Sequence, residues 1–361
     1  MNVTLRIILM MLFIFQLSCQ KNSHETNEIR YFSQLTGIIS PYFDYQPRGE
    51  INRSEASNMN HYRVIYDTEN KISELSYYKG ENKSNESYFR THTVKYNYRD
   101  KKLERTYYNL EGEKAFMWRH YYMGGPIHKE VFALSNDGRK ASLIFEDTVG
   151  NQAVTTLGTA LITWETLNER TFIQAQFKLD GSPNLLTEYF PFYKSRITAN
   201  KRNHLLLIEN VNEDGLLSMS DSAGYARVKF VFDEFGNEMS WEFQDVDGNL
   251  VNRVPFRKMD HGYAKWTYQK YWKNRMLGLV DSVSEKYFGA NSNPIENNFS
   301  IHETFYKMTK GGDLKSIEYY GQNKEPRMHP QQGFFRMSFQ YDSKGKRSVV
   351  QRFDVEGAEI E

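Results

Sequence analysis

The chain has 361 residues and a nearly balanced charge, with 46 Lys+Arg against 45 Asp+Glu. It therefore lacks the basic excess of a nucleic-acid surface, and we expect no nucleic-acid partner. Aromatic residues make up 15% of the chain while proline is scarce, at 9 residues, a composition that favours strands. Because Cys19 is the only cysteine, the fold has to be stable without an internal disulfide.

Residues 1–18 have the features of a signal peptide: a basic start and an apolar run over residues 7–15. That run is too short to cross about 30 Å of hydrocarbon as a helix. The ending Leu17-Ser18-Cys19 resembles the lipobox of bacterial lipoproteins, although Gln16 departs from the aliphatic residue usual there. The resemblance implies that Cys19 receives diacylglycerol and becomes the first mature residue. An ordinary secreted protein and an uncleaved anchor are the alternatives.

If Cys19 is lipidated, the membrane is a partner through the lipid, and the protein belongs to the cell envelope. Gln20 does not match the aspartate that retains enteric lipoproteins in the inner membrane, so by resemblance the outer membrane is favoured. Residues 19–28 then form the lipidated cysteine and a flexible polar tether. Residues 29–60 are predicted as an N-terminal helix and loop, because Ile29, Phe32 and Leu35 have helical spacing.

A repeat organises residues 221–361. The pattern D-x-x-G occurs three times at a spacing of twelve, and it returns twice at the C-terminus with the same step. Asp at the first position of a type I turn can bond the backbone two residues on, and Gly at the fourth accepts positive φ. The predicted turn residues are Asp221, Gly224, Asp233, Gly236, Asp245, Gly248, Asp342, Gly345, Asp354 and Gly357. Eight residues remain between turns, enough for one strand.

Weaker copies of this pattern occur in residues 61–220, which we take as a first region of hairpin repeats before the second region, 221–361. Aromatic and polar residues alternate in the intervening segments, as in strands that are buried on one side. The sequence therefore predicts an all-β fold: an antiparallel meander of hairpin repeats forming a twisted or curled sheet, with one short N-terminal helix. A barrel-like arrangement is left open.

The Y-D-x-x-G style of Tyr341-Asp342-x-x-Gly345 resembles two bacterial groups, the YD repeats of Rhs-type proteins and the MORN-like repeats. The resemblance is degenerate and covers about 62–150 and 221–361. It implies an extended antiparallel sheet that serves as a scaffold or binding surface. Neither group carries catalytic residues that can be transferred to this chain.

Motifs for catalysis or metal binding are not found in the sequence. The nine histidines are scattered, with none in a close metal-ligand spacing. The segment 245–249 begins like a calcium loop, but Phe256 stands where a bidentate Glu is needed, so we interpret it as a turn. There is no G-x-S-x-G elbow, phosphate loop or dinucleotide fingerprint. We therefore predict no catalytic residue, metal or cofactor, and a protein that is not an enzyme.

Four pairs of adjacent tyrosines suggest a contact surface. Neighbours on a strand face opposite sides, so one tyrosine of each pair faces away from the core. The candidate binding surface consists of Tyr78, Tyr108, Tyr122 and Tyr320. The tryptophans are a second candidate, for stacking on sugars, but alternation along the strands favours a core position for Trp241 and Trp266.

These features favour a non-catalytic, membrane-anchored scaffold or binding module with a protein or glycan ligand. Two alternatives have distinct requirements. A glycan-active enzyme needs an acidic pair in a groove of the sheet, with carboxylates roughly 5 to 10 Å apart. A carrier of apolar cargo needs a lined void behind the aromatic face.

Overall fold

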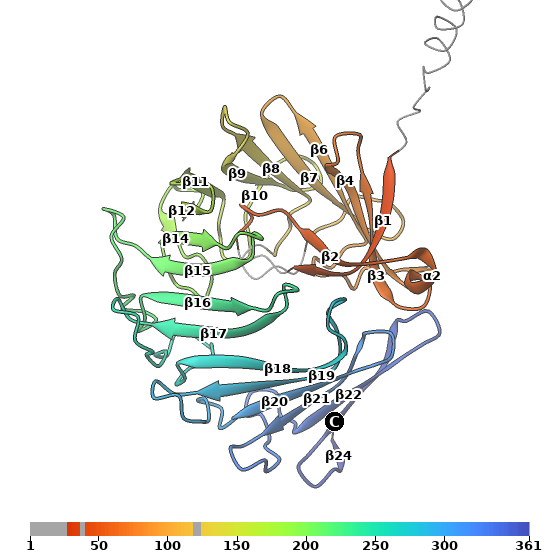
Figure 1. Cartoon of the computed structure of the whole chain (residues 1–361), viewed down its shortest axis with the longest axis vertical. Helices are drawn as coiled ribbons and strands as arrows, with labels where there is room; N and C mark the ends of the chain where they lie inside the picture. The colour runs from red at the N-terminus through yellow and green to blue at the C-terminus, as the bar shows by residue number, and fades with distance from the viewer. Residues whose placement is uncertain (1–26, 37–39, 118–123, 361) are drawn as a thin grey trace, which may run out of the picture.

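The protein is one antiparallel sheet of hairpins that follow one another in chain order round an arc (Figure 1). The computed structural model describes residues 27–36, 40–117 and 124–360. The chain enters through β1 (Glu28–Thr36), β2 (Gln46–Ile51) and a four-residue helix, α2 (Arg53–Ala56). Four two-residue strands each pair with a longer one: β5 (Asn82–Lys83), β10 (Gln152–Ala153), β13 (Pro183–Asn184) and β24 (Glu359–Ile360).

The body of the sheet consists of long hairpins. In the first half they are β3 (Asn60–Tyr66) with β4 (Ile72–Lys79), β6 (Thr93–Arg99) with β7 (Lys102–Tyr108), β8 (Lys129–Leu134) with β9 (Lys140–Glu146), and β11 (Leu161–Thr166) with β12 (Thr171–Phe177). They continue as β14 (Lys194–Ala199) with β15 (Leu205–Asn210), β16 (Arg227–Phe232) with β17 (Glu238–Gln244), and β18 (Lys265–Asn274) with β19 (Leu279–Phe288). The last are β20 (Glu303–Met308) with β21 (Leu314–Tyr320) and β22 (Arg336–Tyr341) with β23 (Arg347–Phe353).

The predicted all-β antiparallel meander is confirmed. Each hairpin pairs with the next, and β15 pairs with β16, so the sheet continues across residue 221. Among the described residues, β2 pairs only with β1 and β24 only with β23, which leaves both edges open. The sheet is therefore not closed, and the barrel-like arrangement does not form.

The predicted helix over residues 29–39 is wrong where the structure describes it. Residues Glu28–Thr36 form β1, which is hydrogen-bonded to β2 on one side and β3 on the other. Phe32 is buried in the core, and its neighbour Ser33 is buried on the opposite face, where its hydroxyl donates to the carbonyls of Gly49 and Leu277. Because both faces are covered, the strand lacks alternation of apolar and polar residues, which allowed a helical interpretation.

Four of the five D-x-x-G segments form turns directly after a strand, at the rims of the sheet. At Asp233, the N–H groups of Phe235 and Asn237 donate to the carboxylate at 3.0 and 2.8 Å, and Gly236 N–H donates to the Asp233 carbonyl at 3.1 Å. Gly236 has a φ of 83°, the left-handed conformation that glycine adopts without strain. The same bonds recur at Asp245 and at Asp342.

The remaining two D-x-x-G segments differ from one another. Asp354 begins a turn of the same kind, with the Ala358 N–H bonded to its carboxylate at 2.8 Å and Gly357 N–H to its carbonyl at 3.2 Å. Near Asp221, by contrast, Gly224 N–H donates to the Ser220 carbonyl at 2.8 Å. That turn begins one residue earlier and lies in the connection between β15 and β16, not at the tip of a hairpin.

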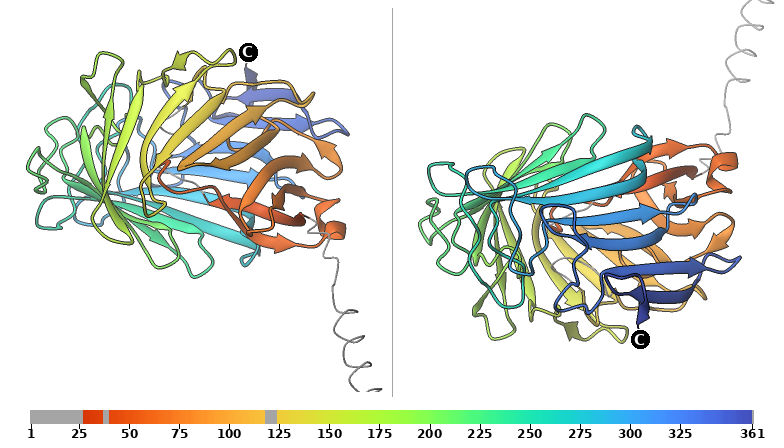
Figure 2. Two further views of the ribbon diagram at one scale, coloured as in Figure 1. Left: turned by 90° about the horizontal axis from the view of Figure 1, so that it is seen from above. Right: turned by 90° about the horizontal axis from the view of Figure 1, so that it is seen from below.

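Side chains of the first strands contact turns that come much later in the chain. Lys79 on β4 is bonded to Asp313 (2.6 Å) and to the Gly345 carbonyl (2.7 Å), and it is only 6% exposed. Arg48 on β2 donates to Asn237 at 2.7 Å. Both views of Figure 2 place the red first strands and the blue last hairpins on the same side of the molecule. The sheet thus bends enough to bring its ends together at these side chains.

The inward face of the first hairpins is filled by the chain itself. Residues 40–45 lie in the hollow of the arc (Figure 1), where Tyr42 and Tyr45 pack against its inward face. Tyr42 stacks on Phe172 of β12 with ring centroids 3.9 Å apart, and Tyr45 bonds Tyr107 of β7 at 3.1 Å. We refer to residues 40–45 as the inner segment. The buried aromatic core extends from here along the whole sheet.

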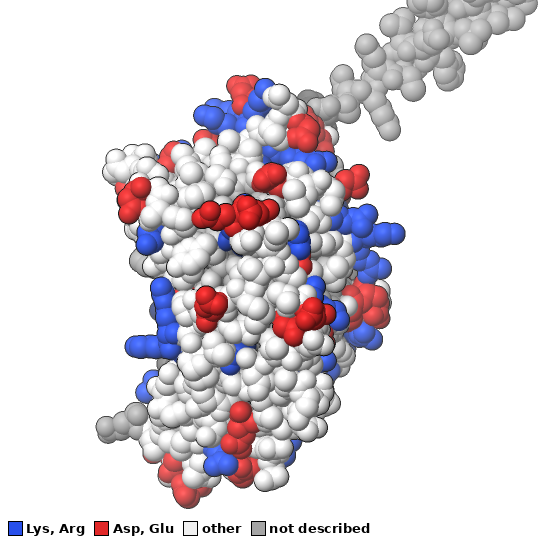
Figure 3. Space-filling model, turned by 90° about the vertical axis from the view of Figure 1, so that its left-hand side faces the viewer, with Lys and Arg blue, Asp and Glu red and all other residues white. Residues whose placement is uncertain are grey.

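Charges of both signs are scattered over the face shown in Figure 3, without a large patch of one sign. No helix among the residues that the structure describes is long and apolar enough to cross a membrane.

Candidate functional site

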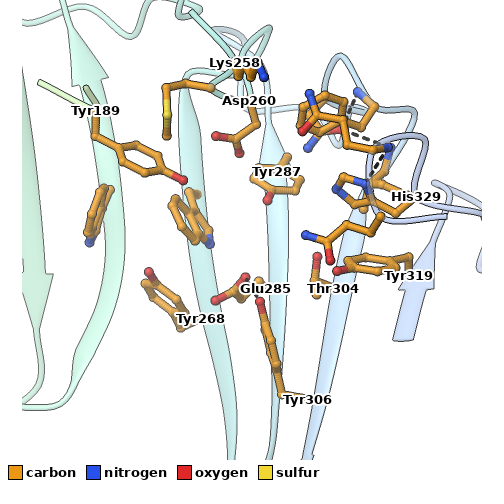
Figure 4. A pocket seen from close by; sticks show the side chains of 18 residues that line it. Tyr189, Lys258, Asp260, Tyr268, Glu285, Tyr287, Thr304, Tyr306, Tyr319 and His329 are labelled. Carbon is orange, nitrogen blue, oxygen red and sulfur yellow. Dashed lines mark hydrogen bonds between the residues drawn. The ribbon is translucent and has the colours of Figure 1, made fainter. Parts of the chain in front are cut away.

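A cavity of about 440 Å³ lies on the inward face of β17–β21, where the inner segment does not reach. Eighteen residues line it, from five strands and the connections that close over them. Figure 4 shows Tyr268, Glu285, Tyr306 and Tyr319 projecting from the strands toward it, with Asp260 and Tyr189 approaching from the loops. Its size is in the range of small-molecule sites.

The register of the strands builds the floor of this cavity from two cross-strand rows. Trp241, Trp266 and Tyr287 are direct partners on β17, β18 and β19. The Trp241 and Trp266 ring centroids are 5.2 Å apart, so the two indoles form a continuous aromatic surface.

The second row runs beside the first, two residues along the strands. It consists of Tyr268, Glu285, Thr304 and Tyr319 on β18 to β21. Side chains two apart on a strand share a face, so both rows point inward. Glu285 therefore lies among the mainly aromatic side chains of the floor.

Burial makes Glu285 the unusual acid of the site. Desolvation raises its pKa from the ordinary 4.5 to about 8, although a hydrogen bond from the Tyr306 hydroxyl at 3.0 Å acts in the opposite direction. The nearby charges of Asp260 and Glu238 raise the pKa further. Glu285 is therefore mainly protonated at neutral pH and can donate a hydrogen bond into the cavity.

Asp260 is held at the loop side of the cavity. Its Oδ2 accepts from the Tyr263 hydroxyl at 2.9 Å, and Arg253 lies 3.7 Å from Oδ1. Among the described residues, buried Oδ1 has no hydrogen-bond partner, and the same is true of the Nε1 of Trp266. Both residues line the cavity, and polar groups at its wall suit a polar ligand.

Together these groups can hold a ring with two apolar faces and a polar rim. The indole and phenol rings offer flat surfaces for stacking, while Asp260, Glu285 and the Trp266 N–H offer bonds at the edges. His329 closes one side, with its ring centroid 4.8 Å from that of Tyr319. Within the part of the chain that the structure describes, no group of three or more His, Cys, Asp or Glu side chains could hold a metal ion.

The predicted tyrosine surface lies on the other face of the sheet. Tyr77, Tyr107 and Tyr319 are the buried members of their pairs. Their neighbours Tyr78, Tyr108 and Tyr320 are half-buried and point away from the cavity.

Each outward tyrosine contacts another side chain of the protein. Tyr78 stacks on His61 with centroids 5.4 Å apart, Tyr108 meets His128 edge-on at 5.6 Å, and Tyr320 donates to Glu318 at 2.7 Å. The candidate residues Tyr122 and Cys19 lie outside the described residues.

The tryptophans divide between core and cavities. Trp164 is buried and donates to Gln174, and Trp241 is only 4% exposed, as expected for a core residue. Trp266 is less buried and lines the cavity, whereas Trp272 lines a second one. Trp118 lies outside the described residues.

Sequence reasoning missed Glu285 and Asp260, since 45 acidic residues gave no reason to choose these two. One signal was present: Glu285 stands between Val283 and Tyr287 in the apolar phase of its strand, where a charged residue is unexpected. Asp260 comes from an irregular connection and has no such pattern.

Comparisons with known proteins give distant likenesses only. No family model and no curated protein matches the chain. Among solved structures, a porin-like protein from Bacteroides uniformis shares 12% identity over 72% of this chain and 86% of its own, with a TM-score of 0.26. The Photorhabdus luminescens Tc holotoxin pore shares 10% identity over 82% of this chain and 15% of its own, with a TM-score of 0.17.

Proposed function

We propose that this chain is a lipid-anchored protein of the bacterial cell envelope that binds a glycan in the cavity over β17–β21, without catalysing a reaction. The observation that supports it most is the aromatic floor of Trp266, Tyr268 and Tyr287 combined with acidic and amide side chains at its edge. A sugar ring presents C–H groups on its faces and hydroxyls on its rim, which matches this arrangement.

The envelope location is supported by the signal-like residues 1–18 and by the lipobox-like Leu17-Ser18-Cys19. It is tested by the mass of the N-terminal peptide of protein purified from its host membrane. A diacylglyceryl-modified Cys19 supports the anchor, and an unmodified start elsewhere removes the membrane from the proposal.

Glycan binding is tested by isothermal titration with neutral hexasaccharides of glucose, mannose and N-acetylglucosamine. We expect at least one to bind, and Tyr268→Ala to weaken that binding by about tenfold or more through the loss of stacking. The matched control is Tyr271→Ala: Tyr271 is on the same strand but 46% exposed and absent from the cavity wall. Equal losses in the two variants, or binding by none of the sugars, would contradict the proposal.

An enzymatic role is the second candidate, because Asp260 and Glu285 line one cavity and Glu285 has the raised pKa of a general acid. Incubating the protein with the bound hexasaccharide and measuring new reducing ends separates the two functions. Intact sugar supports a binding module, while cleavage that Glu285→Gln abolishes supports a hydrolase. Transport of apolar cargo is disfavoured, since such a cargo would desolvate Asp260, Asn297 and Gln331 without bonding them.

A further inference from the structure

A second cavity of about 330 Å³ lies beside the first along the same two strands. Trp266 and Tyr268 of β18 line the first cavity, and the next inward residues, Lys270 and Trp272, line the second. Its far wall comes from the first strands of the sheet, including Arg48. The two cavities are therefore neighbours on one inward face.

The charged residues that line the second cavity are cations alone, whereas the first has Lys258 as well as Asp260 and Glu285 in its wall. Arg48, Lys270, Lys273 and Lys310 line the second cavity, and none of its lining residues that the structure describes carries a carboxylate. Lys273 and Lys310 are exposed at the mouth, whereas Arg48 and Lys270 are half-buried. Cations that are partly removed from water without an anion among them attract an anionic ligand.

The two half-buried cations keep unused hydrogen-bond donors. Lys270 Nζ donates to the Glu238 carbonyl at 2.6 Å, which uses one of its three N–H groups. Arg48 donates through Nη1 to Asn237 at 2.7 Å, and its buried Nε has no partner among the described residues. Burial lowers the pKa of Lys270 to about 8, a cost that a bound anion would offset.

The acidic residues closest to these cations are already engaged elsewhere. Asp233 pairs with Arg275 at 3.0 Å and accepts from Asn237. Glu238 accepts from the indole of Trp241, and burial raises its pKa. Neither lines the cavity.

The rest of the wall fits an anion that is attached to an organic body. Trp272, Leu279 and Val283 give the cavity an apolar side opposite the cations. Gly278 permits the approach of Arg48, because a Cβ at that position would lie 2.8 Å from Arg48 Nη1. A freely hydrated ion would gain nothing from the apolar side.

We propose that the second cavity binds an oxyanion group, a phosphate or sulfate ester, carried by the same glycan whose sugar ring occupies the first cavity. This inference rests on the proposed glycan binding. Arg48 and Lys270 are the residues that bind the oxyanion, and Trp272 packs against the ring that carries it. Tetrahedral oxyanions have enough free oxygens to accept from both cations at once.

The test measures binding of inorganic phosphate and of sulfate by titration calorimetry, against chloride at equal ionic strength. We expect saturable binding that Lys270→Gln and Arg48→Gln each weaken by about tenfold. Lys286→Gln is the control, because Lys286 of β19 faces away from both cavities and contacts Gln269. Two variants from different strands protect against a misfolded one, and thermal melts identify it. Comparing the affinities for phosphate and sulfate shows which ester the site prefers.

The second arm uses sulfated and neutral forms of one hexasaccharide. We expect the sulfated form to bind about tenfold tighter, with the advantage lost in Lys270→Gln. Equal affinity of the two forms, or no saturable oxyanion binding, overturns the inference even if neutral glycans bind. Tyr268→Ala should weaken glycan binding by about tenfold or more and leave phosphate binding intact. Oxyanion binding without any glycan binding would overturn the proposed function instead.

Discussion

The first and second halves of the sheet have the same hairpin architecture but differ in what covers their inward faces. Over β7–β12 the inner segment fills the hollow, and buried charges there are paired: Arg105 with Glu130 at 2.8 Å, and Lys140 with Asp44 at 2.7 Å. Over β17–β21 the hollow is open, and aromatic rings together with Glu285 line a cavity. Aromatic content alone therefore does not distinguish a core from a site in this protein.

What distinguishes the halves is whether a segment of the chain lies on the inward face. Lys140 Nζ also donates to the Pro41 carbonyl, so the inner segment supplies both partners of that ammonium. The open half has no equivalent segment among the described residues, and a cavity lies there instead. A ligand in the second half would therefore fill the hollow there, as residues 40–45 fill it in the first.

The largest expected effect comes from removing a buried carboxylate in the first half, whose hollow the inner segment fills. Arg105 and Glu130 are both fully buried, and the guanidinium lies over the Tyr45 ring at 4.8 Å. Glu130→Ala leaves that charge without its carboxylate, so we expect a loss of about 3–5 kcal/mol in the free energy of unfolding. Urea denaturation measures it, with Glu69→Ala as the control for an exposed ion pair to Lys71.

A double variant makes this prediction sharper. Arg105→Met with Glu130→Leu should recover much of the loss, because apolar residues avoid the desolvation of both charges. Glycan and phosphate binding by the double variant should remain as in the wild type. If the single variant unfolds no more easily than Glu69→Ala, the pair does not support the filled half.

Much of the fold could be predicted because its signals are local. The turn at Asp233 needs only a carboxylate and a glycine three residues on, and the strands between turns alternate visibly. The twelve-residue step is the distance between turns on opposite rims, as from Asp233 to Asp245, and not the full repeat. Equivalent strand starts lie 32 residues apart from His128 to Ala160 and 38 from Ala226 to Ala264, because the irregular connections vary in length.

The site could not be predicted, since it depends on contacts that the local sequence does not encode. The row of Tyr268, Glu285 and Thr304 exists only once the register of three strands is fixed. The emptiness of the second half depends on where a distant segment, residues 40–45, comes to lie. The same cause explains the wrong helix: β1 is covered on both faces by β-structure and turns far along the chain.

An intermediate effect should come from the protonated acid of the open half. In the unfolded chain Glu285 loses its proton near 4.5, whereas in the folded protein it keeps it to about 8. The folded state thus binds more protons between these values, and stability falls as pH rises through that window. Glu285→Gln should be more stable than the wild type by about 2 kcal/mol at pH 6 and unchanged at pH 4.

Urea denaturation at the two pH values measures this difference, and exposed Glu356→Gln serves as the control that should change neither. If the stability difference between Glu285→Gln and the wild type is the same at both pH values, Glu285 is ionised in the cavity. The floor of the open half would then carry a negative charge, and the comparison with the charge-paired half would lose its basis.

The smallest expected effect concerns the strand starts of the first hairpins. His92 and His128 occupy a position that Ala160, Ala226 and Ala264 hold in other hairpins, since each backbone N–H donates to the end of the following strand. Burial lowers the pKa of both histidines below the ordinary 6.5. The unfolded chain then binds more protons just below pH 6.5, so stability falls as the pH decreases from there. His92→Gln should reduce this fall by under about 1 kcal/mol. Thermal melts at pH 7.5 and 5.5 measure it, and a wild-type loss that the variant leaves unchanged would place the acid sensitivity outside the first hairpins.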